Sequence, residues 1–223
     1  MASASRPKYR IAVLAGVNGA GKSSLMGANV RAHGGEYFNP DEAARRIREA
    51  RPRLAQREAN GLAWNEGRRL LERAIDEHHD YTFESTLGAS TIPRLLARAA
   101  DEGADVWVWF VGLDSAERHL ARVRSRVKAG GHDIPEADIR RRWDASRENL
   151  VALMPKLARL WIYDNSAEAD PVSGHAPKPR LILEMNAGRI VAPANLRETP
   201  AWAKPLVARA LQLDEAARRK PRR

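Results

Sequence analysis

The chain contains no cysteine, and the start of its sequence has only a short apolar run. Without cysteine it can form no disulfide, no thiolate metal site and no cysteine nucleophile. The apolar run near the start covers 11–15, which is too short for a signal-peptide core or a membrane span. These features favour a protein of the cytoplasm that has no membrane partner.

The composition is that of an ordinary globular protein. Hydrophobic residues make up 43% and charged residues 30% of the 223 residues, far from the composition of a disordered chain. This length suits one well-cored α/β domain and is too short for two domains of usual size.

The net charge of +10 comes from two segments. Residues 118–142 contain eight Lys or Arg and three Asp or Glu, and residues 216–223 contain five Lys or Arg and no acid. The rest of the chain is balanced, with 25 residues of each sign. We therefore expect one segment that handles phosphates and a tail that is solvated or binds a partner, rather than a protein that is basic throughout.

Short apolar runs alternate with longer stretches of helical period, for example at 61–78 and 90–103. This alternation predicts an α/β fold with a parallel sheet and helices on both faces. A β-hairpin turning at 186–188 is predicted to follow. The predicted strands, in a kinase-like spatial order 2-3-1-4-5, are 35–39, 81–85, 11–16, 105–112 and 159–165.

The strongest chemical signal is GVNGAGKSS at 16–24, which follows an apolar strand and precedes a helical stretch. Its glycines, Lys22 and Ser23 satisfy the phosphate-loop pattern G-x-x-x-x-G-K-[ST]. In such loops backbone N–H groups cradle phosphate, the lysine reaches the β- and γ-phosphates, and the hydroxyl binds Mg²⁺. The predicted nucleotide-binding residues are Gly16, Asn18, Gly19, Ala20, Gly21, Lys22, Ser23 and Ser24.

Two carboxylates follow neighbouring predicted strands. Asp41 lies in the first turn of a helix capped by Asn39, and Glu84 ends an apolar run. Because the carboxyl ends of parallel strands open onto one crevice, both acids should face Lys22. Asp41 is a candidate general base, with helix capping alone as the alternative. Glu84, with Thr86 beside it, is expected to hold Mg²⁺ through water or to bind substrate hydroxyls; the start of a solvated loop is the alternative.

The first basic segment predicts two helices joined by a glycine-containing turn. Arg118, Arg122 and Arg126 recur every four residues on the first helix, and 140–142 lie on the second. Such a pair, within about 114–150, suits a lid that closes over nucleotide phosphates. A solvated charged surface is the alternative.

Four motifs between residues 10 and 165 resemble the zeta-toxin family of P-loop kinases, specifically its chromosomal, UDP-N-acetylglucosamine kinase-like branch. In chain order they are GVNGAGKSS, FNPDEAAR, FESTLG and RVRSRVKAGGHDIPEADIRRRW. The resemblance implies an enzyme that uses ATP and Mg²⁺ to phosphorylate the 3′-hydroxyl of a UDP-amino sugar. It also implies a possible antitoxin protein as partner.

The resemblance further implies roles for individual residues. Lys22 and Ser23 would bind nucleotide and metal, with Lys22 also catalytic, and Asp41 would be the general base. Glu84 and Thr86 would contact substrate, and Arg126 and Arg141 would contact phosphates. One departure is Gly88, which stands where related sequences commonly have serine. This departure leaves the identity of the sugar open.

We therefore expect a single P-loop kinase domain over 1–223. Its parts would be a core at 9–166, the helical lid, a hairpin and helix at 179–213 and the basic tail at 216–223. Two other interpretations stay open. One is a kinase of another hydroxyl, such as that of a nucleoside, a drug or an RNA end. The other is a nucleotide-binding regulator that binds nucleic acid through the basic tail.

Overall fold

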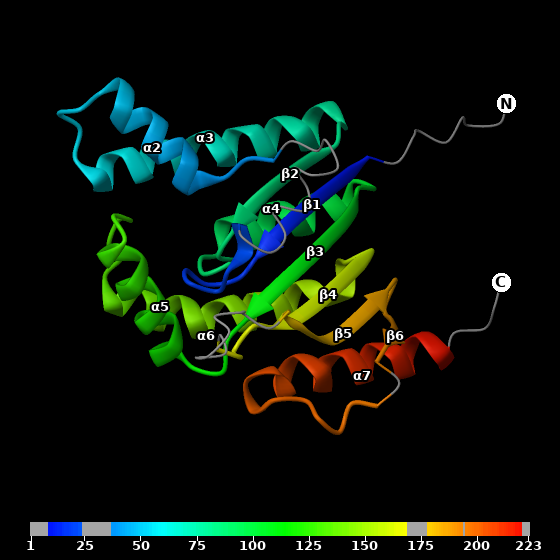
Figure 1. Ribbon diagram of the computed structural model, residues 1–223. Helices are drawn as coiled ribbons and strands as arrows, with labels where there is room; N and C mark the ends of the chain where they lie inside the picture. Colours follow the sequence, from blue (N-terminus) through cyan, green and yellow to red (C-terminus); the bar gives the residue numbers. More distant parts are fainter. Residues whose placement is uncertain (1–8, 24–36, 169–177, 194, 220–223) are drawn as a thin grey trace, which may run out of the picture.

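The fold is built on one six-stranded sheet with helices packed along it, as Figure 1 shows. The structure, a computed structural model, describes residues 9–23, 37–168, 178–193 and 195–219. Its strands are β1 (Arg10–Ala15), β2 (Tyr81–Ser85), β3 (Asp105–Gly112), β4 (Arg159–Asp164), β5 (Arg180–Asn186) and β6 (Arg189–Ala192). Its helices are α2 (Pro40–Ala50), α3 (Gln56–Glu77), α4 (Thr91–Asp101), α5 (Ala116–Lys128), α6 (Glu136–Leu153), η2 (Met154–Lys156), η3 (Ala201–Ala203) and α7 (Lys204–Arg219).

The strands lie in the order β2-β1-β3-β4-β5-β6, and the first four are parallel. This order confirms the predicted arrangement of the parallel strands. The predicted strand at 35–39 is represented among the described residues by an isolated parallel bridge between Phe38 and Phe83. It therefore lies beside β2, at the outer position that the kinase-like order requires, while residues 35 and 36 lie outside the described part of the chain.

The predicted hairpin is present and extends the sheet. β5 pairs antiparallel with β4, and β6 pairs antiparallel with β5. Ala187 and Gly188, between the two strands, have φ angles of 45° and 77°. Two consecutive positive φ angles are typical of the tight turns that match the twist of a hairpin.

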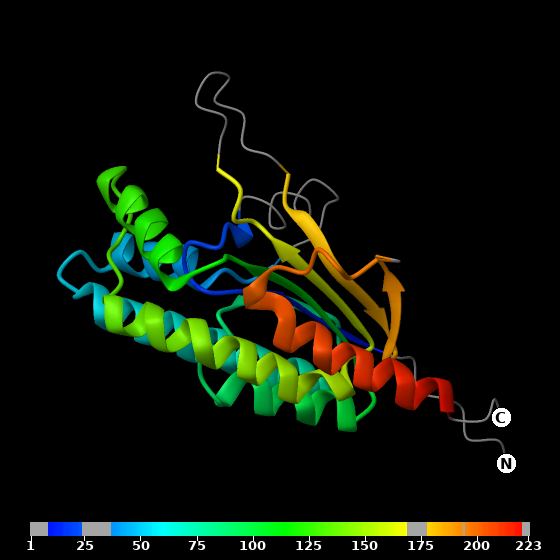
Figure 2. The same cartoon turned by 90° about the horizontal axis from the view of Figure 1, so that it is seen from below.

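Helices α3, α4, α6 and α7 lie along one face of the sheet, as the view in Figure 2 shows. Alternate strand residues point to this face, because successive side chains of a strand point in opposite directions. Fully buried leucines from the four helices, among them Leu71, Leu96, Leu150 and Leu206, join these strand residues in one core. The described helices that build this core cover one face, and residues 24–36, within which the sequence predicted the helix after the phosphate loop, lie outside the described part of the chain. None of the described helices combines the length and apolar character needed to cross a bilayer.

The opposite face of the sheet carries a group of tryptophans. Trp109 of β3 and Trp161 of β4 are stacked, with ring centroids 4.8 Å apart and planes at 4°. Trp107 meets both rings edge-on, and the guanidinium of Arg159 lies 5.2 Å from its centroid. Since the three indoles and the arginine contact one another, each large apolar surface on this face is partly covered by its neighbours.

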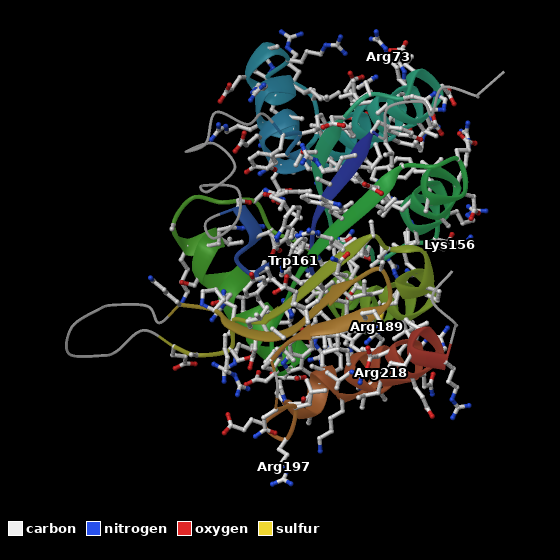
Figure 3. The ribbon with its side chains drawn as sticks, turned by 90° about the vertical axis from the view of Figure 1, so that its right-hand side faces the viewer. Arg73, Lys156, Trp161, Arg189, Arg197 and Arg218 are labelled. Carbon is white, nitrogen blue, oxygen red and sulfur yellow. The ribbon has the colours of Figure 1, made fainter. Side chains whose placement is uncertain are left out.

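Ion pairs hold α7 against the hairpin. Asp214 accepts hydrogen bonds from Arg189 Nε of β6 at 2.9 Å and from Arg218 Nε, one turn further along α7, at 2.7 Å. The Ile190 amide donates to the same carboxylate at 3.2 Å. Figure 3 shows Arg189 and Arg218 on adjoining elements. The start of the predicted basic tail is thus part of a helix, while residues 220–223 lie outside the described residues.

A glycine at the end of β3 allows the C-terminal part of the chain to pack on the sheet. A Cβ atom on Gly112 would lie 2.3 Å from the buried ring of Trp202 in η3. We expect Gly112→Ala to lower the free energy of unfolding by about 1–3 kcal/mol, because the added methyl overfills this contact. Urea unfolding measures the change.

Gly61→Ala in α3 is the matched control, since nothing lies within 4 Å of a Cβ atom there. It should raise the free energy of unfolding by about 0.5–1 kcal/mol through helix propensity. Equal stability of the two variants would contradict the packing argument.

Candidate active site

The phosphate loop leaves the carboxyl end of β1 and turns sharply. Gly16, Gly19 and Gly21 have φ angles of 139°, 82° and 93°, a region that side chains disfavour. A Cβ atom at Gly16 would lie 2.2 Å from the carbonyl oxygen of Val111 in β3. The glycine therefore lets the loop start directly against the sheet. Ser24, predicted to bind nucleotide, lies outside the described residues.

Lys22 lies at the centre of the charged groups. Its Nζ donates a hydrogen bond to the Gly16 carbonyl oxygen at 2.7 Å. Burial lowers the pKa of this ammonium group, while the negative charges of Glu84 and Asp41 act to raise it. Arg126 and Arg142 add to the lowering. The lysine and the two predicted acids thus share one electrostatic environment.

Glu84 is a buried carboxylate, with 7% of its surface exposed, and is not the start of a solvated loop. Asn39 Nδ2 donates to Glu84 Oε1 and to Ser23 Oγ, each at 3.3 Å. Burial raises the pKa of Glu84; the charge of Lys22 and a hydrogen bond from the Ser23 hydroxyl oppose this rise. Polar neighbours therefore compensate for much of the cost of burying this acid.

Asp41 lies in the first turn of α2, and Asn39 fixes its position. The Oδ1 atom of Asn39 accepts hydrogen bonds from the backbone amides of Asp41 at 2.9 Å and Glu42 at 3.2 Å. Pro40 is at the first helical position, as the sequence predicted. The N-terminus of α2 therefore presents the Asp41 carboxylate on the same rim as Lys22.

Two groups from the α5–α6 region lie over Asp41. Arg126 Nη1 is 3.4 Å from Asp41 Oδ2, and His132 Nε2 is 3.7 Å from Asp41 Oδ1. The Nε–H of Arg126 is buried, with no hydrogen-bond partner among the described residues. In the sequence, His132 has no histidine or acid partner at the spacing of metal ligands. Only the fold brings it to Asp41.

Thr86 belongs to a short loop that is tied to α6. Its Oγ1 accepts a hydrogen bond from the Gly88 amide at 3.2 Å. Asn149 Nδ2 of α6 donates to the Leu87 carbonyl oxygen at 2.7 Å. Leu87 is buried and has a φ angle of 51°. These contacts hold Thr86 beside Glu84 on the rim, while the predicted roles of both residues remain predictions.

Of the consecutive arginines on α6, Arg142 meets the phosphate loop. Its Nη1 donates to Asn18 Oδ1 at 2.9 Å, and burial lowers the pKa of the guanidinium. A Cβ atom on Gly88 would lie 2.5 Å from Arg142 Cγ, so the glycine leaves room for the arginine. Arg141 instead pairs with Asp138 at 2.8 Å and has a side chain that is 66% exposed. The structure brings Arg142 to the loop in place of Arg141.

His119 supports the phosphate loop from α5, and sequence reasoning missed it. It is 1% exposed, and its Nδ1 lies 2.8 Å from the Asn18 carbonyl oxygen. Burial lowers its pKa to about 4. The ring is therefore neutral at pH 7, and Nδ1–H donates to the carbonyl. No periodic pattern or motif marks this position, because the partner of His119 is a backbone carbonyl that only the folded loop brings to it.

We expect His119 to make the protein less stable in acid. Because its pKa is lower in the folded state, the unfolded chain binds more protons between pH 6.5 and 4, so stability falls as the pH falls through that window. The contribution is about 3 kcal/mol at most. Denaturant unfolding of His119→Asn should show a shallower loss between pH 7 and 4 than the parent protein. The control is His79→Asn, whose side chain is 45% exposed; an unchanged slope in His119→Asn would contradict the assignment.

Comparisons with solved structures agree with this fold. A crystal structure of AvrRxo1-ORF1:-ORF2 with ATP matches with a TM-score of 0.64 and 13% identity, covering 91% of this chain and 64% of that one. The chain thus spans just under two thirds of that protein. The PezAT chromosomal toxin-antitoxin system of Streptococcus pneumoniae matches with a TM-score of 0.57 and 12% identity, covering 98% of this chain and 91% of that one. At these identities the likeness shows the fold alone, which is the expected P-loop kinase type.

Sequence comparison gives a closer relationship. No protein-family model matches the chain. A protein of Haemophilus influenzae described as uncharacterized is 34% identical over 128 residues, which cover 57% of this chain and 88% of that protein. The chain therefore belongs to the same family as this Haemophilus influenzae protein, and it has the fold of the P-loop kinases.

Proposed function

We propose that the protein is a kinase that uses ATP and Mg²⁺ to phosphorylate a small-molecule hydroxyl. The leading acceptor is UDP-N-acetylglucosamine or a related UDP-amino sugar, on the strength of the four sequence motifs. The observation that carries the proposal is the rim shared by Lys22, Glu84 and Asp41, whose charges act on one another although they come from three segments. Phosphoryl transfer needs such a combination of a cation, metal-binding oxygens and a base.

In the proposed reaction the acceptor oxygen attacks the γ-phosphorus, its proton passes to Asp41, and ADP leaves. Lys22 and the backbone amides of the phosphate loop would hold the phosphates. Arg126 is now paired with Asp41, at 3.4 Å. An incoming phosphate carries more negative charge than a carboxylate, so it would draw Arg126 away and leave Asp41 available to the hydroxyl.

Ser23 and Glu84 fit a magnesium site of the kind found beside phosphates. Mg²⁺ is usually held by one or two protein oxygens together with waters and substrate phosphates. In agreement with such a sparse site, the described residues contain no group of three His, Cys, Asp or Glu that could hold a metal by themselves. The Ser23 hydroxyl would bind the ion directly and Glu84 through water. When bound, the ion neutralises charge on the phosphate oxygens.

The acceptor would be held on the side of Glu84 and Thr86. Glu84 is fixed in β2, and the loop that carries Thr86 is fixed to α6 through Asn149, so a sugar hydroxyl would meet preorganised oxygens. The neighbouring PezAT structure is described as a toxin-antitoxin system. By analogy of fold alone, an antitoxin-type protein is a proposed partner of this chain.

The test of the proposal is an acceptor panel. The protein is incubated with ATP and Mg²⁺ and with UDP-sugars, nucleosides or RNA ends, and mass spectrometry measures the gain of one phosphate. We expect a UDP-amino sugar to gain a phosphate and nucleosides and RNA ends to remain unchanged. Phosphorylation of a nucleoside or RNA end alone would replace the proposed acceptor, and absence of any transfer would contradict the kinase.

Two variants assign the roles within that assay. Lys22→Ala should abolish ATP turnover, because the cation that contacts the phosphates is lost. Asp41→Asn should keep nucleotide binding and lower phosphoryl transfer by about 10²- to 10⁴-fold, because an amide cannot take the proton. Unchanged transfer in Asp41→Asn would remove this residue from the mechanism.

Arg142 and Arg141 give a paired prediction on the same helix. Arg142→Ala should weaken ATP binding by about tenfold or more, since the guanidinium that lies against the loop at Asn18 would no longer be available to pair with phosphate. Arg141→Ala should change the affinity by less than about twofold, because exposed ion pairs contribute little. Titration calorimetry with ATP measures both. A larger effect of Arg141→Ala would reverse the assignment.

A further inference from the structure

Asn39 joins three segments that bear the functional groups of the site. Its side chain is buried, with 7% of the residue exposed, just before α2. It contacts the first turn of α2, the carboxyl end of β2 through Glu84, and the phosphate loop through Ser23. In the sequence it is marked only as a helix cap, which accounts for one of these three contacts.

The orientation of the Asn39 amide follows from its partners. The backbone N–H groups of Asp41 and Glu42 are donors, so the side-chain atom facing them must be the carbonyl oxygen. The NH₂ group therefore faces the Glu84 carboxylate and the Ser23 hydroxyl oxygen, 3.3 Å from each. The two halves of the amide thus act separately, since the oxygen caps a helix and the nitrogen donates into the site.

The choice of asparagine is informative because other residues cap helices equally well. Aspartate and serine are as good as asparagine at an N-cap. Aspartate would place a second carboxylate against buried Glu84, and serine is too short to reach it. Only asparagine both caps α2 and donates to an acid that is already difficult to bury.

We propose that Asn39 is a positioning residue that aligns the Glu84 carboxylate and the Ser23 hydroxyl for a magnesium-bound nucleotide. The inference rests on the proposed function only in taking Mg-ATP as the ligand. Through its amide, Asn39 links the predicted metal-binding oxygens to the helix that carries Asp41. Loss of the amide donor would leave the helix in place and disorder the two oxygens.

Asn39→Ser tests the donor while keeping the cap. Calorimetry compares ATP affinity with Mg²⁺ and with a chelator, so no acceptor is needed. We expect the strengthening of ATP binding by Mg²⁺ to fall by about tenfold, the usual effect of losing a hydrogen bond to a charged group. Affinity without Mg²⁺ should remain close to that of the parent protein.

The matched control is Asn195→Ser. Asn195 Oδ1 accepts from the Arg197 amide at 2.9 Å, the same local bond that Asn39 makes to Asp41, but it lies away from the site. This control should retain the full effect of Mg²⁺. If Asn39→Ser also retains it, or if the parent protein binds ATP equally well with and without Mg²⁺, the proposal is overturned.

Asn39→Asp gives an independent test. Aspartate keeps the helix cap but replaces the NH₂ donor with an acceptor-only carboxylate facing Glu84 and Ser23. The strengthening of ATP binding by Mg²⁺ should therefore fall at constant pH, as in Asn39→Ser. An effect of Mg²⁺ equal to that in the parent protein would overturn the proposal. A loss of acceptor phosphorylation in every assay, with these binding effects intact, would count against the kinase function alone.

Discussion

The hydrogen bond from the Gly16 amide to the Ser85 carbonyl oxygen, 3.1 Å long, is the contact on which the site depends. It continues the parallel register of β1 and β2, in which Leu14 lies beside Glu84 and Ala15 beside Ser85. Because both strands end at the same level, the phosphate loop and the Glu84 carboxylate begin their turns side by side. The electrostatic environment that Lys22 shares with both acids follows from this register.

Charged groups on the rim partly compensate one another. Burial disfavours the charged forms of Lys22 and Glu84, and each acts to restore the charge of the other. Arg126 forms an ion pair with Asp41, and Arg142 donates a hydrogen bond to Asn18. Such pairing keeps the charged groups in place, and it leaves them able to change partners when an anion enters. The arrangement is therefore suited to an exchange of ionic partners more than to rigid stability.

The sequence predicted those parts of the fold that depend on residues close together in the chain. The phosphate loop, the cap of α2, the parallel strands and the hairpin each carry a short pattern with a direct physical meaning. The sequence could not tell which of Arg141 and Arg142 meets the loop. Neighbouring residues on a helix point about 100° apart, and the contact with Gly88 decides between them. His119 was missed for the same reason, and so was the contact of His132 with Asp41, since the partners of both histidines are distant in sequence. Gly88, which stands where related sequences commonly have serine, leaves space for the side chain of Arg142.

The helical pair predicted as a lid is anchored at both ends. α5 lies against the phosphate loop, where a Cβ atom on Gly19 would come within 2.9 Å of the His119 carbonyl oxygen. The second half of α6 is part of the core and holds the Thr86 loop through Asn149. A rigid swing of the pair would break both sets of contacts. Under the proposed function, closure over a nucleotide would therefore involve the junction around Gly130, which has a φ angle of 90°, together with the side chain of Arg126. Arg126 and His132 at this junction both contact Asp41, so under the proposed function a motion there that admitted phosphate would also free the proposed base.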